Sequence, residues 1–159
     1  MFTAASEGKT KVMEWLKAQN ADINARDASG ETPMFVAVSK GKLDAMKWLR
    51  SQGMSIDPNG SRYMVMAAGG GYTLIVQWLK GQGVSVNTMH GTETPMSAAA
   101  RNGHLETMKW LKNQKASVDP LEFRRSIGGG PWETAYTTSP LSVAKDEKTK
   151  KWLRDNGAR

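Results

Sequence analysis

Hydrophobic positions recur along this 159-residue chain in a pattern that repeats every 30 to 33 residues. In the first four copies, a Trp-Leu pair follows a hydrophobe two residues before the Trp, a Gly seven before it and an Ala eleven before it. A fifth Trp-Leu pair begins at Trp152. So many coincident positions indicate one structural repeat used several times. The first four pairs begin at Trp15, Trp48, Trp78 and Trp110, and their glycines are Gly8, Gly41, Gly71 and Gly103.

Each repeat is predicted to form two short helices joined by a tight turn, and the second repeat shows why. Thr32 can cap a helix through its side chain, and Pro33 suits the first helical position. Gly41 can supply a left-handed turn between one helix over residues 34–39 and another over 43–51. The apolar residues of the second helix recur at helical spacing, so one face should be buried. Because one such pair is too small to bury this face alone, stacked neighbours must bury it together.

The five repeated Trp residues are expected to lie in the core, at the seam between stacked repeats. The alternative is a platform on which nucleic-acid bases stack, which would need exposed rings. Met13, Met46 and Met108 each lie two residues before a repeated Trp and are expected to fill the core rather than bind a metal.

These residues resemble the ankyrin repeat, whose motif runs Thr-Pro-Leu-His-x-Ala, then Gly-His-Leu, a hydrophobic second helix and Gly-Ala-Asp. The resemblance extends over residues 1–119 and 139–158. The matching segments are Thr94-Pro95-Met96-Ser97-Ala98-Ala99-Ala100-Arg101-Asn102-Gly103-His104-Leu105-Glu106, then Thr32-Pro33-Met34 with Gly41-Lys42-Leu43, and Asn20-Ala21-Asp22-Ile23-Asn24.

The resemblance implies an all-α fold, an ankyrin-like solenoid of stacked helix-turn-helix repeats with finger loops. We expect a single domain over residues 1–159, with five repeats and one insertion. The third repeat departs from the motif, because Arg62-Tyr63 replaces Thr-Pro. The fifth has lost three residues and its Gly, and the first begins inside its first helix, so a partner or a longer array should cover that end. The repeats are 1–24, 25–57, 58–87, 88–119 and 139–159, and the insertion is 120–138.

The insertion at residues 120–138 interrupts the fourth finger. Asp119 and Pro140 are 21 residues apart, whereas the equivalent Asn24 and Pro33 are nine apart. Loops of this length are usually functional or disordered, and this one is rich in residue types found at binding hot spots. It therefore either binds a partner or folds back to cap the fifth repeat, and the two are compatible. The hot-spot types are Phe123, Arg124, Arg125, Trp132 and Tyr136.

The resemblance implies a binding function carried by the fingers and the exposed face of the first helices. We expect a non-enzymatic protein–protein interaction module or scaffold, or a small structural subunit of a larger assembly. Its partner would be another protein, offering a folded surface or an extended peptide. The candidate contact residues outside the insertion are Arg26, Ser29, Glu31, Ser39, Lys40, Met89, His90, Glu93, Arg101 and Asn102.

The charge balance leaves one alternative function open. The chain has 22 Lys and Arg against 15 Asp and Glu, a formal net charge of +7. Many of the cations flank the buried stripe of the second helices, where they should form a solvated outer face. The alternative is a basic surface that binds nucleic acid or another acidic partner, although no nucleic-acid-binding motif is present. The cations are Lys11, Lys17, Lys47, Lys80, Lys109 and Lys112.

The composition excludes several further classes. Without Cys there is no disulfide scaffold, thiolate metal site or Cys nucleophile. The glycine triplets at 69–71 and 128–130 lack the Lys-Ser/Thr of a phosphate loop, and no Ser-His-Asp set can be assembled. We therefore expect no enzymatic activity, no metal and no cofactor. A mean hydropathy of −0.52 without a long apolar run excludes a membrane span. The expected location is intracellular, in the cytoplasm or nucleus, with an organelle left open.

Overall fold

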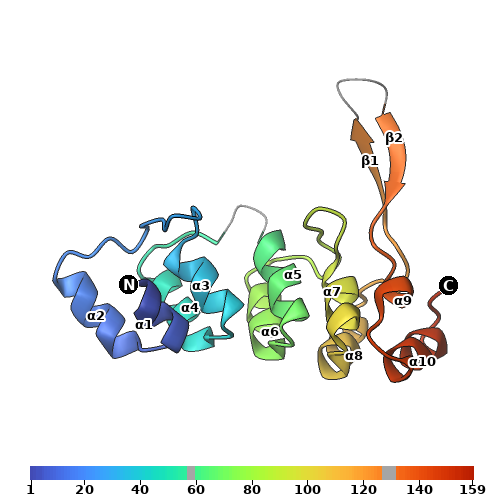
Figure 1. Cartoon of the computed structure of the whole chain (residues 1–159), viewed down its shortest axis with the longest axis horizontal. Coiled ribbons are helices and arrows are strands. Elements are labelled where there is room, and N and C mark those ends of the chain that lie inside the picture. The colour runs from blue at the N-terminus through green and yellow to red at the C-terminus, as the bar shows by residue number, and fades with distance from the viewer. Residues whose placement is uncertain (57–59, 127–131) are drawn as a thin grey trace. The chain divides into compact units, whose positions relative to one another are not determined.

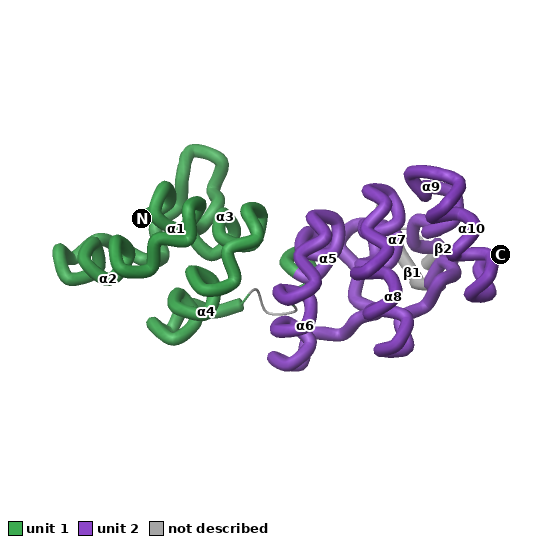
Figure 2. The backbone as a smooth tube through the Cα atoms, turned by 90° about the horizontal axis from the view of Figure 1, so that it is seen from below, with its two compact units in different colours: residues 1–63 green, residues 64–159 purple. Residues whose placement is uncertain are grey.

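A computed structural model describes residues 1–56, 60–126 and 132–159. These ranges contain ten helices and two strands, and the helices are arranged in stacked pairs (Figure 1). The chain divides into two compact units, Met1–Tyr63 and Met64–Arg159 (Figure 2). The elements are α1 Phe2–Glu7, α2 Thr10–Ala18, α3 Pro33–Ser39, α4 Leu43–Ser51, α5 Ser61–Gly69, α6 Thr73–Gly81, α7 Pro95–Asn102, α8 Leu105–Asn113, β1 Glu122–Ser126, β2 Trp132–Tyr136, α9 Pro140–Val143 and α10 Glu147–Asp155.

The first helices begin where the Thr-Pro and Ser-Pro pairs predict. The Thr32 hydroxyl accepts a hydrogen bond from the backbone N–H of Phe35, with Pro33 in the first turn of α3. At α7, Thr94 and Ser97 form a reciprocal capping box, with N···O distances of 2.9 and 3.1 Å. Such caps satisfy backbone donors that a helix leaves unpaired at its start.

The turn between the two helices of a repeat contains a glycine in the left-handed backbone conformation, seven residues before the Trp. Gly8, Gly41, Gly71 and Gly103 all have φ between 68° and 73°. Three of them also lie against a side chain from the next repeat. A Cβ at Gly71 would lie 2.6 Å from Nδ1 of His104, and one at Gly8 would lie 3.3 Å from Cδ of Lys42. Glycine therefore serves two needs at once, the backbone angle and the close approach of the next repeat.

The core is made of the residues on either side of the repeated Trp rather than of the Trp itself. Met13, Met46 and Met108 are fully buried, as predicted, and so are the Leu residues after the last four Trp. The prediction for the indoles is wrong for Trp15, whose exposed fraction is 62%, and the other four repeated Trp are only partly buried. The buried Leu residues are Leu49, Leu79, Leu111 and Leu153.

The insertion folds as an antiparallel β-ribbon, which the sequence did not predict. Strands β1 and β2 pair in register from Glu122 opposite Tyr136 to Ser126 opposite Trp132. Its base is tied down next to the pairing: the N–H of Thr137 donates to the carbonyl of Leu121 at 2.8 Å, and the Thr137 hydroxyl accepts from the N–H of Leu121. Residues 127–131 lie outside the described part of the chain.

The fifth repeat keeps its second helix although its first has shrunk to the four residues of α9. The missing glycine is replaced by an extended link at Ala144, and the N–H of Lys145 donates to the carbonyl of Ala100 in α7. Asp146 then caps α10, accepting from the N–H of Thr149 at 2.8 Å. This hydrogen bond is the main cause that lowers the pKa of Asp146 below its ordinary value.

The two roles of the turn glycines predict different losses of stability for three Gly→Ala variants. Gly71→Ala should lower the free energy of unfolding by about 1–2 kcal/mol for the left-handed backbone alone, and further through the clash with His104. Gly83→Ala, with φ 91° and open space around it, should show the backbone cost without the clash. Gly81→Ala, within α6, should be neutral or stabilising by up to about 1 kcal/mol. Chemical denaturation of the three variants measures this order, and equal effects would contradict it.

The Asp146 cap predicts a specific dependence on acid. Because its pKa is lowered in the folded chain, the cap stabilises folding above the ordinary pKa and loses this effect as the pH falls through the lowered value. Asp146→Asn should cap α10 equally well near pH 7, since Asn is as good an N-cap. Thermal melts of the two proteins should coincide near pH 7, and below pH about 4 the wild type should lose more stability than the variant. Parallel acid profiles would contradict this assignment.

Candidate functional site

The first finger and the helices beside it form a groove of about 670 Å³ in the N-terminal unit. Arg26 and Glu31 of the finger line it, together with Phe35 of α3. Arg62 and Tyr63, at the start of α5, also line it. The groove therefore combines aromatic side chains with charges of both signs.

Arg62 is the central charged group of this groove. Its Nη2 lies 2.6 Å from Oε1 of Glu31, and its guanidinium carbon lies 4.0 Å from the centre of the Phe35 ring. The cation–π contact and the ion pair together place the guanidinium over the ring, although Arg62 remains about two-fifths exposed. Sequence reasoning did not select Arg62 or Phe35. The available signal was the departure from the motif, because Arg62-Tyr63 stands where Thr-Pro was expected.

The first finger is held rigid by its own polar groups. A carboxylate oxygen of Asp27 accepts from the N–H groups of Ser29 and Glu31, both at 2.9 Å. Nη1 of Arg26 donates to the carbonyl of Gly30 at 2.7 Å. Two predicted contact residues, Arg26 and Glu31, are thereby placed on one groove, and Ser29 is exposed at the turn. A preorganised finger loses little conformational entropy on binding.

The third finger brings together a second set of predicted residues. The backbones of His90 and Glu93 exchange two hydrogen bonds, of 2.9 and 3.1 Å, and close the loop. Arg101 of α7 donates from Nε to Glu93 at 2.8 Å and also forms an ion pair with it. Met89 and His90 are exposed beside this pair. The finger thus presents an apolar and an imidazole side chain on a fixed backbone.

The remaining candidate residues are placed separately. The Asn102 amide donates to the carbonyl of Gly69 at 2.9 Å, which ties α7 to the end of α5. Ser39 is partly buried at the end of α3, and Lys40 is exposed beside it. Tyr136 of β2 has an exposed fraction of 61%. The backbones of four residues lie on the ribbon, but their side chains fall outside the described part of the structure: Phe123, Arg124, Arg125 and Trp132.

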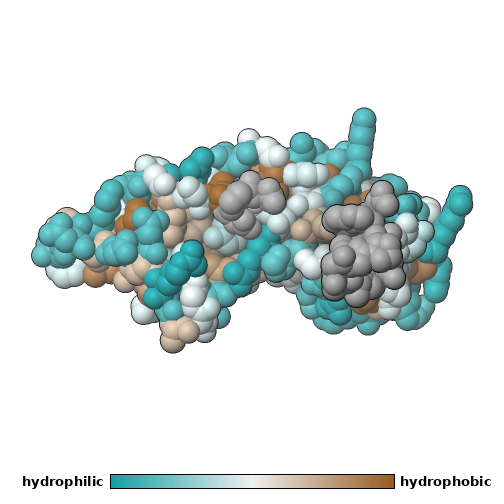
Figure 3. Space-filling view, turned by 90° about the horizontal axis from the view of Figure 1, so that it is seen from above, coloured by the Kyte–Doolittle hydropathy of each residue, from teal (hydrophilic) through white to brown (hydrophobic). Residues whose placement is uncertain are grey.

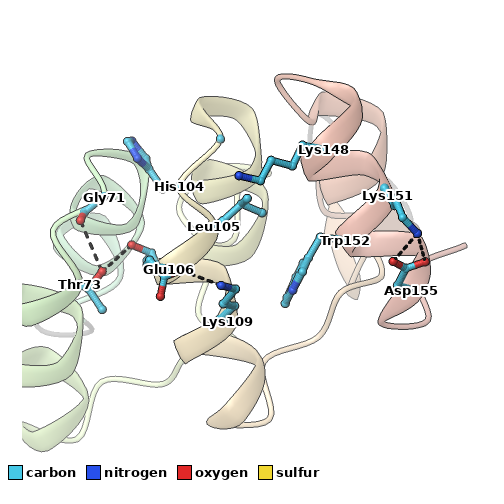
Figure 4. Close-up of a pocket in the computed structure, with 12 residues that line it drawn as sticks. Gly71, Thr73, His104, Leu105, Glu106, Lys109, Lys148, Lys151, Trp152 and Asp155 are labelled. Carbon is cyan, nitrogen blue, oxygen red and sulfur yellow. Dashed lines mark hydrogen bonds and ion pairs between the residues drawn. The ribbon is translucent and has the colours of Figure 1, made fainter.

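A second groove, of about 630 Å³, lies between α8 and α10 in the C-terminal unit (Figure 4). Trp152 faces it from α10 and Leu105 from α8, and Lys148 extends across it. Lys109 and Lys151 also line it, but each is engaged with a carboxylate of its own helix, Glu106 at 2.7 Å and Asp155 at 2.9 Å. These two ion pairs offset the charges of Lys109 and Lys151.

Comparison with known families gives the same result as the repeat pattern and the paired helices. A family of ankyrin repeats in three copies matches residues 1–90, and a single ankyrin repeat matches residues 93–121. The chain belongs to the ankyrin repeat family. A comparison with curated proteins found no match. Ankyrin repeats generally mediate protein–protein interactions and are typically non-catalytic.

The surface of this ankyrin repeat protein is consistent with a binding role. Figure 3 shows hydrophilic residues over much of the displayed face, with hydrophobic residues in small groups between them. Within the described ranges, no three His, Asp or Glu side chains are grouped so that they could hold a metal ion. None of the helices in those ranges is both long and apolar enough to cross a bilayer.

The stacked Arg62 predicts a measurable coupling in the first groove. In a double-mutant cycle, Phe35→Leu and Arg62→Gln should be less destabilising together than the sum of the single changes. The expected coupling is about 0.5–1 kcal/mol, because the guanidinium is partly exposed. Urea denaturation of the four proteins measures it. A strictly additive pair would show that the stacking contributes nothing to stability.

Proposed function

We propose that this chain is a non-enzymatic protein-interaction module that holds a protein partner with its fingers, the exposed face of its first helices and the ribbon at residues 120–138. The observation that carries the proposal is the set of internal hydrogen bonds that fix the first and third fingers. Asp27 holds one and the His90–Glu93 pairing holds the other. A partner that meets fixed loops avoids the cost of ordering them.

The ribbon supports the same proposal in a different way. It is connected to the third finger, since the N–H of Thr138 donates to the carbonyl of Thr92 at 2.6 Å and their hydroxyls are 3.0 Å apart. Tyr136 is exposed, and Tyr is enriched where protein interfaces gain most of their energy. Finger and ribbon could therefore contact one partner together, whether the chain acts as a scaffold or as a subunit of an assembly.

The alternative, a basic surface for nucleic acid or another acidic partner, has less support. Several lysines of the second helices are paired with carboxylates one turn away, which reduces the field they project. Such binding would fall steeply with salt, as the release of counterions requires. Affinity for a duplex or single-stranded oligonucleotide that stayed flat from low to moderate salt, or was absent, would remove this alternative.

The proposal predicts that partners depend on the fingers and the ribbon. Affinity purification from the native extract with the wild type should enrich partners that are lost with a ribbon deletion, in which a short linker joins Leu121 to Thr137. Met89→Ser with His90→Ala should reduce the same partners about tenfold or more, since a hot-spot truncation exceeds about 1.4 kcal/mol. Gln77→Ala, on the exposed side of α6, is the matched control. Equal enrichment by all four proteins would contradict the proposed function.

A further inference from the structure

The base of the ribbon fixes which backbone groups of β1 and β2 point outward. The N–H of Thr137 donates to the carbonyl of Leu121, and these residues lie one step beyond Glu122 and Tyr136 in the register. In an antiparallel pair, residues that bond to each other alternate with residues whose N–H and C=O groups point away from the neighbouring strand. The outward groups therefore belong to the residues with even numbers. They are Glu122, Arg124 and Ser126 on β1, and Trp132, Thr134 and Tyr136 on β2.

The outer edge of β2 is open within the described part of the chain. Both strands project beyond the helices of the C-terminal unit (Figure 1), and Thr134 and Tyr136 are exposed. The outward backbone groups of these two residues form no hydrogen bond with any other described residue. A ribbon of only two strands is marginally stable in water, and a further strand usually supports it. The ribbon therefore has an edge at which such a strand can be added.

The two edges of the ribbon differ in charge. On β1, the central outward position is Arg124, and Glu122 occupies another. Charged residues on an edge strand are a common protection against the addition of further strands. The outward positions of β2 are uncharged, and Trp, Thr and Tyr are residue types that favour strands. Of the two edges, β2 is therefore the one suited to pairing.

The sequence of β2 is complementary to itself. If β2 pairs antiparallel with β2 of a second copy, about a two-fold axis at Thr134, all three outward residues are used at once. Trp132 is then opposite Tyr136 of the second copy, Thr134 is opposite its equivalent, and Glu133 is opposite Ala135. Aromatic pairs and Thr pairs are favourable when directly opposite in a sheet. No two like charges meet in this register.

The other ways of pairing two ribbons fit less well. The same two-fold operation on β1 would place Arg124 opposite Arg124, and like charges directly opposite are destabilising. Pairing β1 of one copy with β2 of the next would leave a free edge on each copy, so that copies would add without limit. Pairing β2 with β2 closes the assembly and leaves only the charged β1 edges outside.

We propose that β2 is a dimerisation edge, which pairs antiparallel with β2 of a second copy of this chain. The two ribbons then form one four-stranded sheet in the order β1-β2-β2-β1. Each of the three outward pairs exchanges two backbone hydrogen bonds. The contact is smaller than a standard protein interface, so the dimer is weak and reversible. This inference goes beyond the proposed function, because the occupant is the same chain rather than a different protein.

Sedimentation velocity of the purified full chain tests the pairing. The weight-average mass of the wild type should rise with concentration toward twice the monomer mass, and no further. Thr134→Glu should hold it at the monomer mass, because two carboxylates would meet at the axis. The ribbon itself should tolerate this change, since residue 134 is opposite Arg124 in the register. Ser126→Glu makes the same change of charge on the outer edge of β1, and this matched control should dimerise like the wild type.

A mixing experiment tests the position of the two-fold axis. Thr134→Lys should be monomeric by itself, for the same reason as Thr134→Glu. An equimolar mixture of the two variants should regain the dimer mass, because opposite charges then meet at the axis.

Hydrogen exchange of the wild type, followed by NMR, gives a readout that needs no variant. The amides of Thr134 and Tyr136 should exchange more slowly at high protein concentration, in proportion to the remaining fraction of monomer. The amides of Glu122 and Arg124, on the outer edge of β1, should be unaffected by concentration. This measurement decides the question if either variant loses its ribbon.

The proposal is overturned if the wild type stays monomeric up to about 1 mM, if dimers survive Thr134→Glu, or if the mixture of folded variants stays monomeric. A mass that rises beyond the dimer would overturn it in favour of pairing between β1 and β2 of successive copies. Slower exchange at β1 instead of β2 would also overturn it. Only the purified chain is measured, so failure here is separate from failure of the proposed function, which concerns a different protein as partner.

Discussion

The structure depends on the burial of one narrow apolar stripe that no single repeat can complete. Each second helix has nine residues, and its Met, Val or Leu side chains reach full burial only with a neighbour beside them. Within each of the two compact units, stability is therefore distributed over the seams between neighbouring repeats. The fingers and the ribbon contribute little to this burial, so their sequences can vary to suit a partner while the stripe stays constant.

The turn glycines extend this constraint to the backbone. Position and φ are repeated from Gly8 to Gly103, and a side chain of the following repeat lies on three of them. At the ends of the second helices the left-handed position is less strict, since Asn20 and Lys115 occupy it with φ of 61° and 65°. Both side chains are exposed, and an added Cβ at the equivalent glycines, Gly53, Gly83 and Gly157, would meet nothing within 4 Å, so only the backbone preference acts there. Glycine occupies the turns where a positive φ is combined with a side chain of the next repeat packed against the backbone.

Much of the fold could be predicted because the same local pattern of apolar residues and glycines, weak in one copy, recurs in several repeats. The caps at Thr32 and Thr94 follow from the Thr-Pro pairs, and the turns and the buried Met residues follow from their repeated spacing. The ribbon could not be predicted, since residues 120–138 occur once and carry no period. The burial of the repeated Trp was overestimated. Helical spacing places each Trp at the edge of the apolar stripe, where its burial depends on whether an adjacent repeat covers it. Arg62 was missed because its partners Glu31 and Phe35 lie in another repeat.

The attachment of the ribbon has a mechanical consequence. Its second strand ends two residues before Thr138, whose N–H donates to the carbonyl of Thr92 in the third finger. Three residues link that strand to α9, and the residue that forms the bond to the finger is the second of them. A pull on the ribbon is therefore transmitted to the third finger before it reaches the last pair of helices. A partner that displaces the base of the ribbon would therefore have to move the third finger as well, or break the hydrogen bond between Thr138 and Thr92.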